Sequence, residues 1–378
     1  MTPTKVLFLD GVREEVVEPA TGPRTALGSD PFEAADAAEE PFSERLEKLR
    51  PLQGPRPGLL RDASSPSASP PRVRRPKSLG PDATLKPRGW ARTPRLAEVD
   101  FAEQSGLLRL LPESERRRLA ALDHLVDGEA PYDRFGFSPG ALRAAFPLFF
   151  ALYRFYFRVK SEGHENIPAE GPAILAANHG GLLPFDGAMG IVDILLHTDP
   201  PRLARAIVDR WAGRLPWVNV FYARVGQVIG TRENFSDLLE DGQLVFVFPE
   251  GVEGIRKLVT QRYRLQRFHV GFVEQSLRAG APIIPMAVLG SDDQAPILFD
   301  LKPVARRLGL PVLPITPTFP WFGPLGLLPY PVRYRIVYGE PLRFHERFGP
   351  EGAEDPRLIR YLANQVRRSV QSLVDRHR

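Results

Sequence analysis

Short apolar runs alternate with amphipathic helical patterns from about residue 155 to the end of the chain. The runs cover 173–177, 203–208, 227–229, 244–248, 283–289 and 332–337, and the helical patterns cover 185–197, 232–240, 267–277 and 356–376. Most runs are apolar at nearly every position, which is typical of strands buried on both faces of a parallel sheet. We therefore predict an α/β fold with a mostly parallel central sheet covered by helices.

Composition divides the chain into three parts. Residues 1–100 are rich in Pro, Ser, Ala, Arg and Glu, show little hydrophobic periodicity, and are predicted to form a disordered tail. A helical segment is expected over 101–158, with Pro112 as a break in its first half. The α/β domain is then expected over 159–378.

The most apolar helical pattern begins at Ser138 and runs to Val159. Arginines and Pro147 interrupt it, so it lacks the stretch of about 20 uncharged apolar residues that spans a bilayer. Two roles stay open for this segment. It can lie in the headgroup region of a membrane, or it can pack on the core of the protein.

The overall charge limits the partners that the chain attracts. A net charge of +5 and a pI near 9.5 favour phospholipid headgroups, acyl-CoA or nucleic acid. The chain has no cysteine, which excludes disulfides and thiolate metal sites and fits a reducing compartment. The apolar stretch Val6–Leu9 is too short for the core of a secretory signal. We expect a cytoplasmic protein that is peripheral or monotopic on a membrane.

A histidine follows the apolar run 173–177 in the sequence NHGG at 178–181, and Asp186 begins the next helical pattern. A neutral imidazole accepts a proton near neutral pH, and a carboxylate on its other ring nitrogen fixes the tautomer and stabilises the imidazolium. The glycines permit a tight turn, which would let the carboxylate return to the ring. The pattern predicts that His179 is a general base and that Asp186 orients it.

Three further motifs follow in order: GQVIGTR at 226–232, FPEG at 248–251 and APIIPM at 281–286. Together with the first motif, these blocks resemble the lysophospholipid acyltransferase family of glycerolipid O-acyltransferases. The resemblance extends over about residues 150–345, and it identifies 159–378 as an acyltransferase domain.

The resemblance implies transfer of a fatty acyl group from acyl-CoA or acyl-carrier protein to a lysophospholipid hydroxyl, for example that of lysophosphatidate, at a membrane surface. His179 and Asp186 would be catalytic, and Arg232 would contact the phosphate of the acceptor. The third block implies substrate contacts by Phe248, Pro249, Glu250 and Gly251. The Thr-Arg pair that usually follows this block is absent, and we expect Lys257 or Arg256 to supply the missing cation.

The interval between His179 and Asp186 holds six residues, whereas four are usual in the family. The longer form is similar to a branch that includes many bacterial and neutral-lipid acyltransferases. A mono- or diacylglycerol acyltransferase is therefore one alternative, and a catalytically silent lipid-binding protein of the same fold is another. No histidine or carboxylate cluster has a metal-ligand spacing, so we expect no metal and no cofactor beyond the acyl donor.

Two other functions are disfavoured, and one segment keeps several roles. Gly136–Gly140 matches the nucleophile elbow of serine hydrolases, but Pro139 removes the backbone N–H needed for an oxyanion hole. Basic residues concentrate in the tail without a nucleic-acid-binding module, so we expect no nucleic-acid partner. The aromatic, proline-rich segment 314–331 cannot form a regular helix. We expect it to dip into lipid, to roof the acyl channel, or to pack as a core loop.

Overall fold

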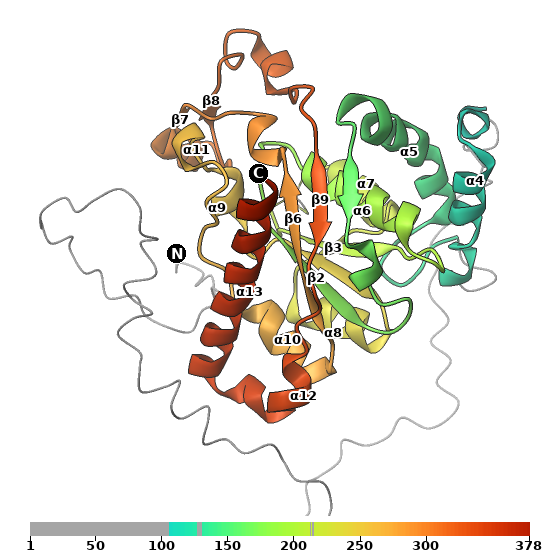
Figure 1. Ribbon diagram of the computed structural model, residues 1–378. Helices are drawn as coiled ribbons and strands as arrows, with labels where there is room; N and C mark the ends of the chain where they lie inside the picture. Colours follow the sequence, from blue (N-terminus) through green and yellow to red (C-terminus); the bar gives the residue numbers. More distant parts are fainter. Residues whose placement is uncertain (1–105, 127–130, 212, 214) are drawn as a thin grey trace, which may run out of the picture. The chain divides into compact units, whose positions relative to one another are not determined.

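The computed structural model describes residues 106–126, 131–211, 213 and 215–378 (Figure 1). The disordered tail expected over 1–100 lies outside the described residues.

In this part of the chain, seven strands form one sheet in the order β1-β9-β6-β2-β5-β3-β4. The strand bounds are β1 Lys160–Glu162, β2 Ala173–Ala177, β3 Ala204–Val208, β4 Val228–Ile229, β5 Leu244–Val247, β6 Ile283–Leu289 and β9 Arg335–Tyr338. Neighbouring strands run parallel except for β6 and β9, so the prediction of a mostly parallel sheet is confirmed. A separate antiparallel pair, which the sequence patterns did not predict, joins β7 Phe299–Asp300 to β8 Pro314–Ile315.

Helices cover both faces of this sheet (Figure 1). Their bounds are α4 Glu113–Ala120, α5 Pro139–Ala151, α6 Phe185–His197, α7 Val218–Arg224, α8 Arg232–Glu240, α9 Val252–Ile255, α10 Gly271–Ala279, α11 Lys302–Arg307, α12 Phe344–Phe348 and α13 Pro356–His377. Buried side chains of α4, α5 and α6 share one hydrophobic cluster with one face of the sheet. On the other face, α8, α10 and α13 pack against β5, β2 and β6.

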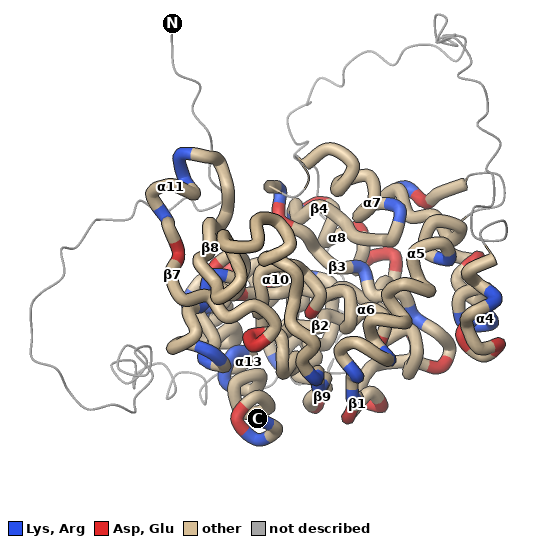
Figure 2. The backbone as a smooth tube through the Cα atoms, turned by 90° about the horizontal axis from the view of Figure 1, so that it is seen from above, with Lys and Arg blue, Asp and Glu red and all other residues tan. Residues whose placement is uncertain are grey.

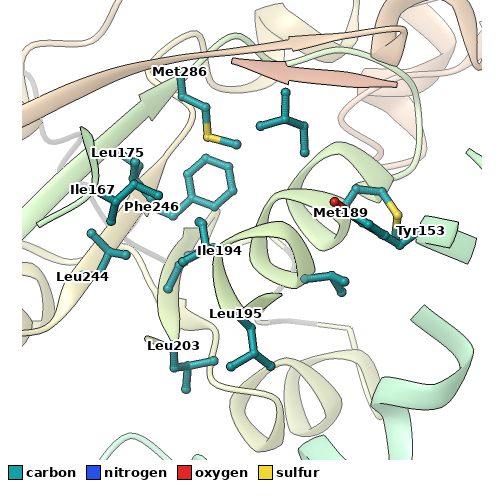
Figure 3. Close-up of a cluster of buried hydrophobic side chains, with 14 of the residues drawn as sticks. Tyr153, Ile167, Leu175, Met189, Ile194, Leu195, Leu203, Leu244, Phe246 and Met286 are labelled. Carbon is teal, nitrogen blue, oxygen red and sulfur yellow. The ribbon is translucent and has the colours of Figure 1, made fainter. Parts of the chain in front are cut away.

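The central strand β2 is buried at every residue and lies between β5 and β6. Because side chains alternate along a strand, Leu175 points into the hydrophobic cluster that also contains Met189 of α6 and Phe246 and Met286 of the neighbouring strands (Figure 3). Ile174 is equally buried but does not belong to this cluster. Burial on both faces explains why the strand is apolar at each position.

Two of the predicted helices, α6 and α8, have the bounds that the patterns indicate. By contrast, α10 begins at Gly271 instead of residue 267. The backbone N–H groups before it have other partners, since Leu265 donates to the Gln371 side chain and Gln266 donates to the Glu250 carboxylate. These side-chain acceptors lie far away in the sequence, so local periodicity does not reveal them.

The segment 138–159 forms α5, and a short π-helical turn, Leu152–Tyr156, continues it. Ser138 begins the helix, as predicted, and its hydroxyl accepts a hydrogen bond from the Ala141 N–H at 3.4 Å. Ser138 therefore has a structural role as the N-cap of α5. Most large apolar side chains of this segment are buried or half-buried, but Leu148 and Phe155 are 63% and 73% exposed. Among the described helices, none is long and apolar enough to cross a membrane.

Asp193, on the inner face of α6, is fully buried and joins four elements. Its carboxylate accepts hydrogen bonds from the Tyr153 hydroxyl at 2.6 Å, the Ser161 hydroxyl at 2.8 Å and the Tyr338 hydroxyl at 2.7 Å. Burial, together with the charge of Asp193, raises the pKa of Tyr338 well above its usual value, so the hydroxyl stays a donor. This network ties β1 and β9 at the sheet edge to α6.

Replacing Asp193 by Ala should lower the free energy of unfolding by roughly 2–5 kcal/mol, because two buried tyrosine hydroxyls lose their acceptor. Urea unfolding followed by circular dichroism measures this loss. Asp237→Ala is the control, since it removes a half-exposed carboxylate that lies 3.8 Å from Arg134. Its effect should stay within about 1 kcal/mol. Equal losses in the two variants would contradict a central role for the network.

Candidate active site

The turn after β2 places His179 at the carboxyl end of the central strand. Gly181 adopts a φ of 76°, in the left-handed region that glycine occupies at low cost. Both glycines of the turn are also closely packed. A Cβ at Gly180 would lie 2.6 Å from the Ser291 hydroxyl, and a Cβ at Gly181 would collide with the Gln294 side chain. The backbone folds back as predicted, and both positions disfavour a side chain, Gly181 through its φ and Gly180 through its close neighbours.

This turn brings His179 and Asp186 together. Nδ1 of His179 lies 2.6 Å from Oδ2 of Asp186, whose carboxylate is fully buried in the first turn of α6. The same carboxylate accepts the backbone N–H groups of Gly180 at 3.0 Å and Gly187 at 2.8 Å, so its orientation is fixed. Because Asp186 accepts a hydrogen bond from the Nδ1–H group, the neutral ring carries its lone pair on Nε2.

The other ring nitrogen of His179 stays open. In the described part of the chain, Nε2 has no hydrogen-bond partner and is not among the buried atoms. The imidazole stacks on the Phe248 ring, with 4.1 Å between the ring centroids and 19° between the planes. Phe248 thus limits the rotation of the base while leaving Nε2 accessible.

Glu250 of the FPEG motif fixes the backbone beside the base. One carboxylate oxygen accepts the His179 N–H at 2.8 Å, and the other accepts the Gln266 N–H at 2.7 Å. The carboxylate is fully buried and lies 3.6 Å from Nζ of Lys257. Nζ also lies 3.2 Å from the Asp292 carboxylate. Glu250 therefore connects the ends of β2 and β5 with the loop before α10.

Lys257 is part of this ion cluster rather than a free surface cation. Burial acts to lower its pKa, but the carboxylates of Glu250 and Asp292 outweigh it, so the pKa is raised and the ammonium stays charged. Its side chain is only 2% exposed. Arg256, the other cation expected there, pairs with Asp300 at 2.8 Å. These contacts give Lys257 a structural role beside Glu250, and its contact with an acceptor phosphate stays a prediction.

The rest of the FPEG block shapes the turn after β5. Pro249 accepts the His269 N–H at 2.8 Å through its carbonyl oxygen. Gly251 has a φ of 56°, and its N–H donates to the Phe248 carbonyl at 2.9 Å. A side chain at Gly251 would be strained in this conformation. These contacts are structural, and substrate contact by this block stays a prediction.

Arg232 lies at the other end of the sheet edge, at the start of α8, and pairs with Glu274 of α10 at 3.2 Å. It follows β4, which β5 and β3 separate from β2. With strands about 4.8 Å apart, its backbone is roughly 14 Å from the end of β2. Its side chain is 59% exposed and can leave the ion pair for a ligand. The structure does not bring its guanidinium directly to His179.

A cavity of about 230 Å³ opens at the ends of β3 and β4. Val208 and Ile229 of these strands line it together with Tyr222 of α7, Asn234 of α8 and Arg134. Its walls are partly apolar and partly polar. Within the described residues, no group of three or more His, Cys, Asp or Glu could hold a metal ion.

The structure adds four residues that the motifs did not single out as site residues. Asn178 pairs with the backbone of Val288 on β6, donating at 3.0 Å and accepting at 2.7 Å. Gly254 leaves room for the base, since a Cβ there would lie 2.6 Å from the Cβ of His179. Asp292 and Gln294 follow directly after β6. Their position after an apolar run was a usable signal, because carboxyl ends of parallel strands share one edge.

Several known proteins are similar to this chain. A family model described as Acyltransferase matches residues 158–289, which include every predicted site residue. An uncharacterized protein of Mycobacterium tuberculosis strain H37Rv is 40% identical over 255 residues, covering 66% of this chain and 70% of that protein. The DGAT1/2-independent enzyme synthesizing storage lipids of Gallus gallus is 27% identical over 217 residues, covering 57% of this chain and 58% of that protein. A crystal structure of the 1-acyl-sn-glycerophosphate (LPA) acyltransferase PlsC from Thermotoga maritima aligns with a TM-score of 0.39 and 18% identity, covering 74% of this chain and 93% of that chain.

Replacing Lys257 by Met should lower the free energy of unfolding by about 3–5 kcal/mol, because two buried carboxylates lose their counter-charge. Urea unfolding measures the effect. The control is Arg262→Met, which breaks the half-exposed pair with Asp293 and should cost no more than about 1 kcal/mol. A stable Lys257→Met protein with a raised KM for a phosphorylated acceptor alone would restore the phosphate-binding role.

Proposed function

Because the chain belongs to the glycerolipid acyltransferase family and is an acyltransferase, we propose that it moves a fatty acyl group from acyl-CoA or acyl-carrier protein to a lysophospholipid hydroxyl at a membrane surface. Lysophosphatidate is the first acceptor to test. The observation that carries the proposal is the 2.6 Å contact between Nδ1 of His179 and Oδ2 of Asp186, with Nε2 left accessible.

In the proposed step, Nε2 of His179 takes the proton of the acceptor hydroxyl as its oxygen attacks the thioester carbonyl carbon. The new C–O bond forms, the C–S bond breaks, and the thiolate leaves with the electron pair. The imidazolium then returns its proton to the thiolate, so the enzyme is regenerated without an acyl-enzyme intermediate. Asp186 stabilises the transient imidazolium and needs no proton of its own.

Electrostatics near the base support this assignment of roles. Asp186 is held by two backbone N–H groups and by the first turn of α6, where a carboxylate is stabilised. It is therefore available as a charged partner for His179. Glu250 binds the backbone of the base, so the imidazole has a fixed starting point for attack.

A mono- or diacylglycerol acceptor is the second candidate. Both cations that would recognise a phosphate have carboxylate partners, Lys257 with Glu250 and Asp292, and Arg232 with Glu274. A neutral acceptor needs no such cation. The Gallus gallus relative is, by its name, an enzyme that synthesizes storage lipids. A silent lipid-binding protein is less well supported, because a protein without chemistry has no need for an accessible Nε2 opposite a buried carboxylate.

His179→Ala should lower kcat by about 10²–10⁴-fold, because the acceptor loses its general base. Asp186→Asn should lower kcat by up to about 10⁴-fold, as in other His–carboxylate pairs. Radiolabelled acyl-CoA with lysophosphatidate or monoacylglycerol as acceptor measures the rate. His124→Ala, at an exposed histidine, is the control. Full turnover by a folded His179→Ala protein would rule out the mechanism.

Arg232→Gln distinguishes the two acceptor classes. If Arg232 binds phosphate, KM for lysophosphatidate should rise roughly tenfold to hundredfold, because a charge-assisted hydrogen bond is lost, while KM for monoacylglycerol should not change. Arg278→Gln is the matched control, since Arg278 pairs with the same Glu274. Equal changes for both acceptors would assign Arg232 a structural role.

A further inference from the structure

The chain segment that connects β6 to β9 carries a group of exposed apolar side chains. We call this group the apolar rim, and its members are Leu298, Phe299, Leu301, Val304, Leu308, Leu310, Trp321, Phe322, Leu325 and Leu328. Trp321 is 75% exposed and Leu325 is 73% exposed. Single exposed apolar residues are ordinary, but so many within one excursion of the chain indicate an interaction surface.

The topology places the apolar rim at the edge of the sheet that carries His179. β6 runs parallel to β2, so both strands end at this edge, and the antiparallel β9 begins there. The excursion from 290 to 334 therefore starts and finishes beside the base. Figure 1 shows α11, β7 and β8 beyond this end of the sheet.

Hydrogen bonds connect the foot of the excursion to the catalytic turn. The Gln294 side chain donates to the Leu183 carbonyl at 3.2 Å and to the Gly180 carbonyl at 3.4 Å. The Gln294 carbonyl accepts the Tyr330 N–H at 2.7 Å. Gln294, which precedes the apolar rim, thus binds both the turn that holds His179 and Tyr330, which follows the rim.

Unneutralised positive charge accompanies the apolar rim. Lys302, Arg306 and Arg307 are exposed on α11, and none of them forms an ion pair with a described residue. Figure 2 shows the basic residues of α11 at the margin of the molecule. Apolar side chains next to basic ones are typical of segments that lie in the headgroup region of anionic membranes.

We propose that the apolar rim and the three cations of α11 form a membrane-docking surface for a bilayer that contains anionic phospholipid. The inference rests on the proposed function, since the acceptor lipid resides in such a bilayer. An acidic carrier protein would also suit the cations, but it would not require the exposed tryptophan, phenylalanine and leucine side chains of the same excursion. Docking by this surface would turn the sheet edge that carries His179 toward the lipid.

The segment 138–159 supplies less surface for this contact. Phe146 is buried, and Phe149 packs its ring against Phe221 with the centroids 6.3 Å apart. Of its large apolar side chains, Leu148 and Phe155 remain well exposed. These two residues provide a matched control, because Phe155 is as exposed as Trp321.

The test measures sedimentation of the full chain with vesicles of phosphatidylcholine, with and without phosphatidylglycerol. The triple variant Trp321→Ser, Phe322→Ser and Leu325→Ser should bind both vesicles at least about a hundredfold more weakly, because three inserted side chains are lost. The control pair Leu148→Ser and Phe155→Ser should bind like the wild type. Loss of binding by the control pair alone would move the docking surface to 138–159 and overturn the proposal.

The charge contribution is tested separately. Arg306→Gln with Arg307→Gln should weaken binding to the anionic vesicles about thirtyfold and leave binding to pure phosphatidylcholine nearly unchanged. Arg116→Gln with Arg117→Gln, which removes the same charge from exposed positions of α4, should have no such effect. If the two double variants weaken binding equally, the effect comes from overall charge, and the proposed surface is contradicted.

Activity with a short-chain, water-soluble acceptor separates docking from catalysis. The triple variant should keep wild-type turnover on this acceptor while losing turnover on vesicle-bound acceptor. Unchanged vesicle binding by the triple variant would overturn the docking surface whatever its activity, and selective loss of turnover with acyl-carrier protein would point to a protein partner instead. A wild-type protein that binds vesicles through the apolar rim but transfers no acyl group would refute the proposed function and leave the docking surface in place.

Discussion

The buried carboxylate of Glu250 is the contact on which the geometry at the strand ends depends. A charge inside a protein must be compensated, and here two backbone N–H groups and one ammonium provide the compensation. Because these donors come from the turn after β2, the loop before α10 and Lys257, the requirement draws separate segments to one point. The contact with Glu250 fixes the backbone of His179. It also engages the Gln266 N–H, so α10 begins later than predicted.

Much of this arrangement could be predicted from local patterns. The parallel sheet and the bounds of α6 follow from runs and periodicity, and the contact between His179 and Asp186 follows from a strand end, two glycines and a helix start. The role of Lys257 as a buried counter-ion could not be predicted in this way. Its partners depend on which strand ends become neighbours, and residue type alone could not distinguish a buried counter-ion from a surface cation. The two-residue strands β7 and β8 are likewise too short to produce a periodic signal.

The charge arrangement bears directly on acceptor choice. An acyltransferase that recognises a phosphate needs a cation near the attacking hydroxyl, yet the cation after the FPEG motif is used inside the protein. The remaining candidate, Arg232, lies across the sheet edge and beyond β5 and β3. Under the proposed function, opening of the exposed ion pair between Arg232 and Glu274 would decide between a charged and a neutral acceptor. Chemistry at His179 would be identical in both cases.

The close approach of Gly181 to Gln294 has a consequence for the history of the protein. No side chain fits at position 181 while the glutamine amide occupies that space, and the amide in turn holds two carbonyl groups of the turn. Each residue thus restricts which mutations the other can accept. Among related sequences, a side chain at position 181 should appear only where residue 294 is smaller and the turn has a different backbone conformation, because a φ of 76° disfavours residues other than glycine.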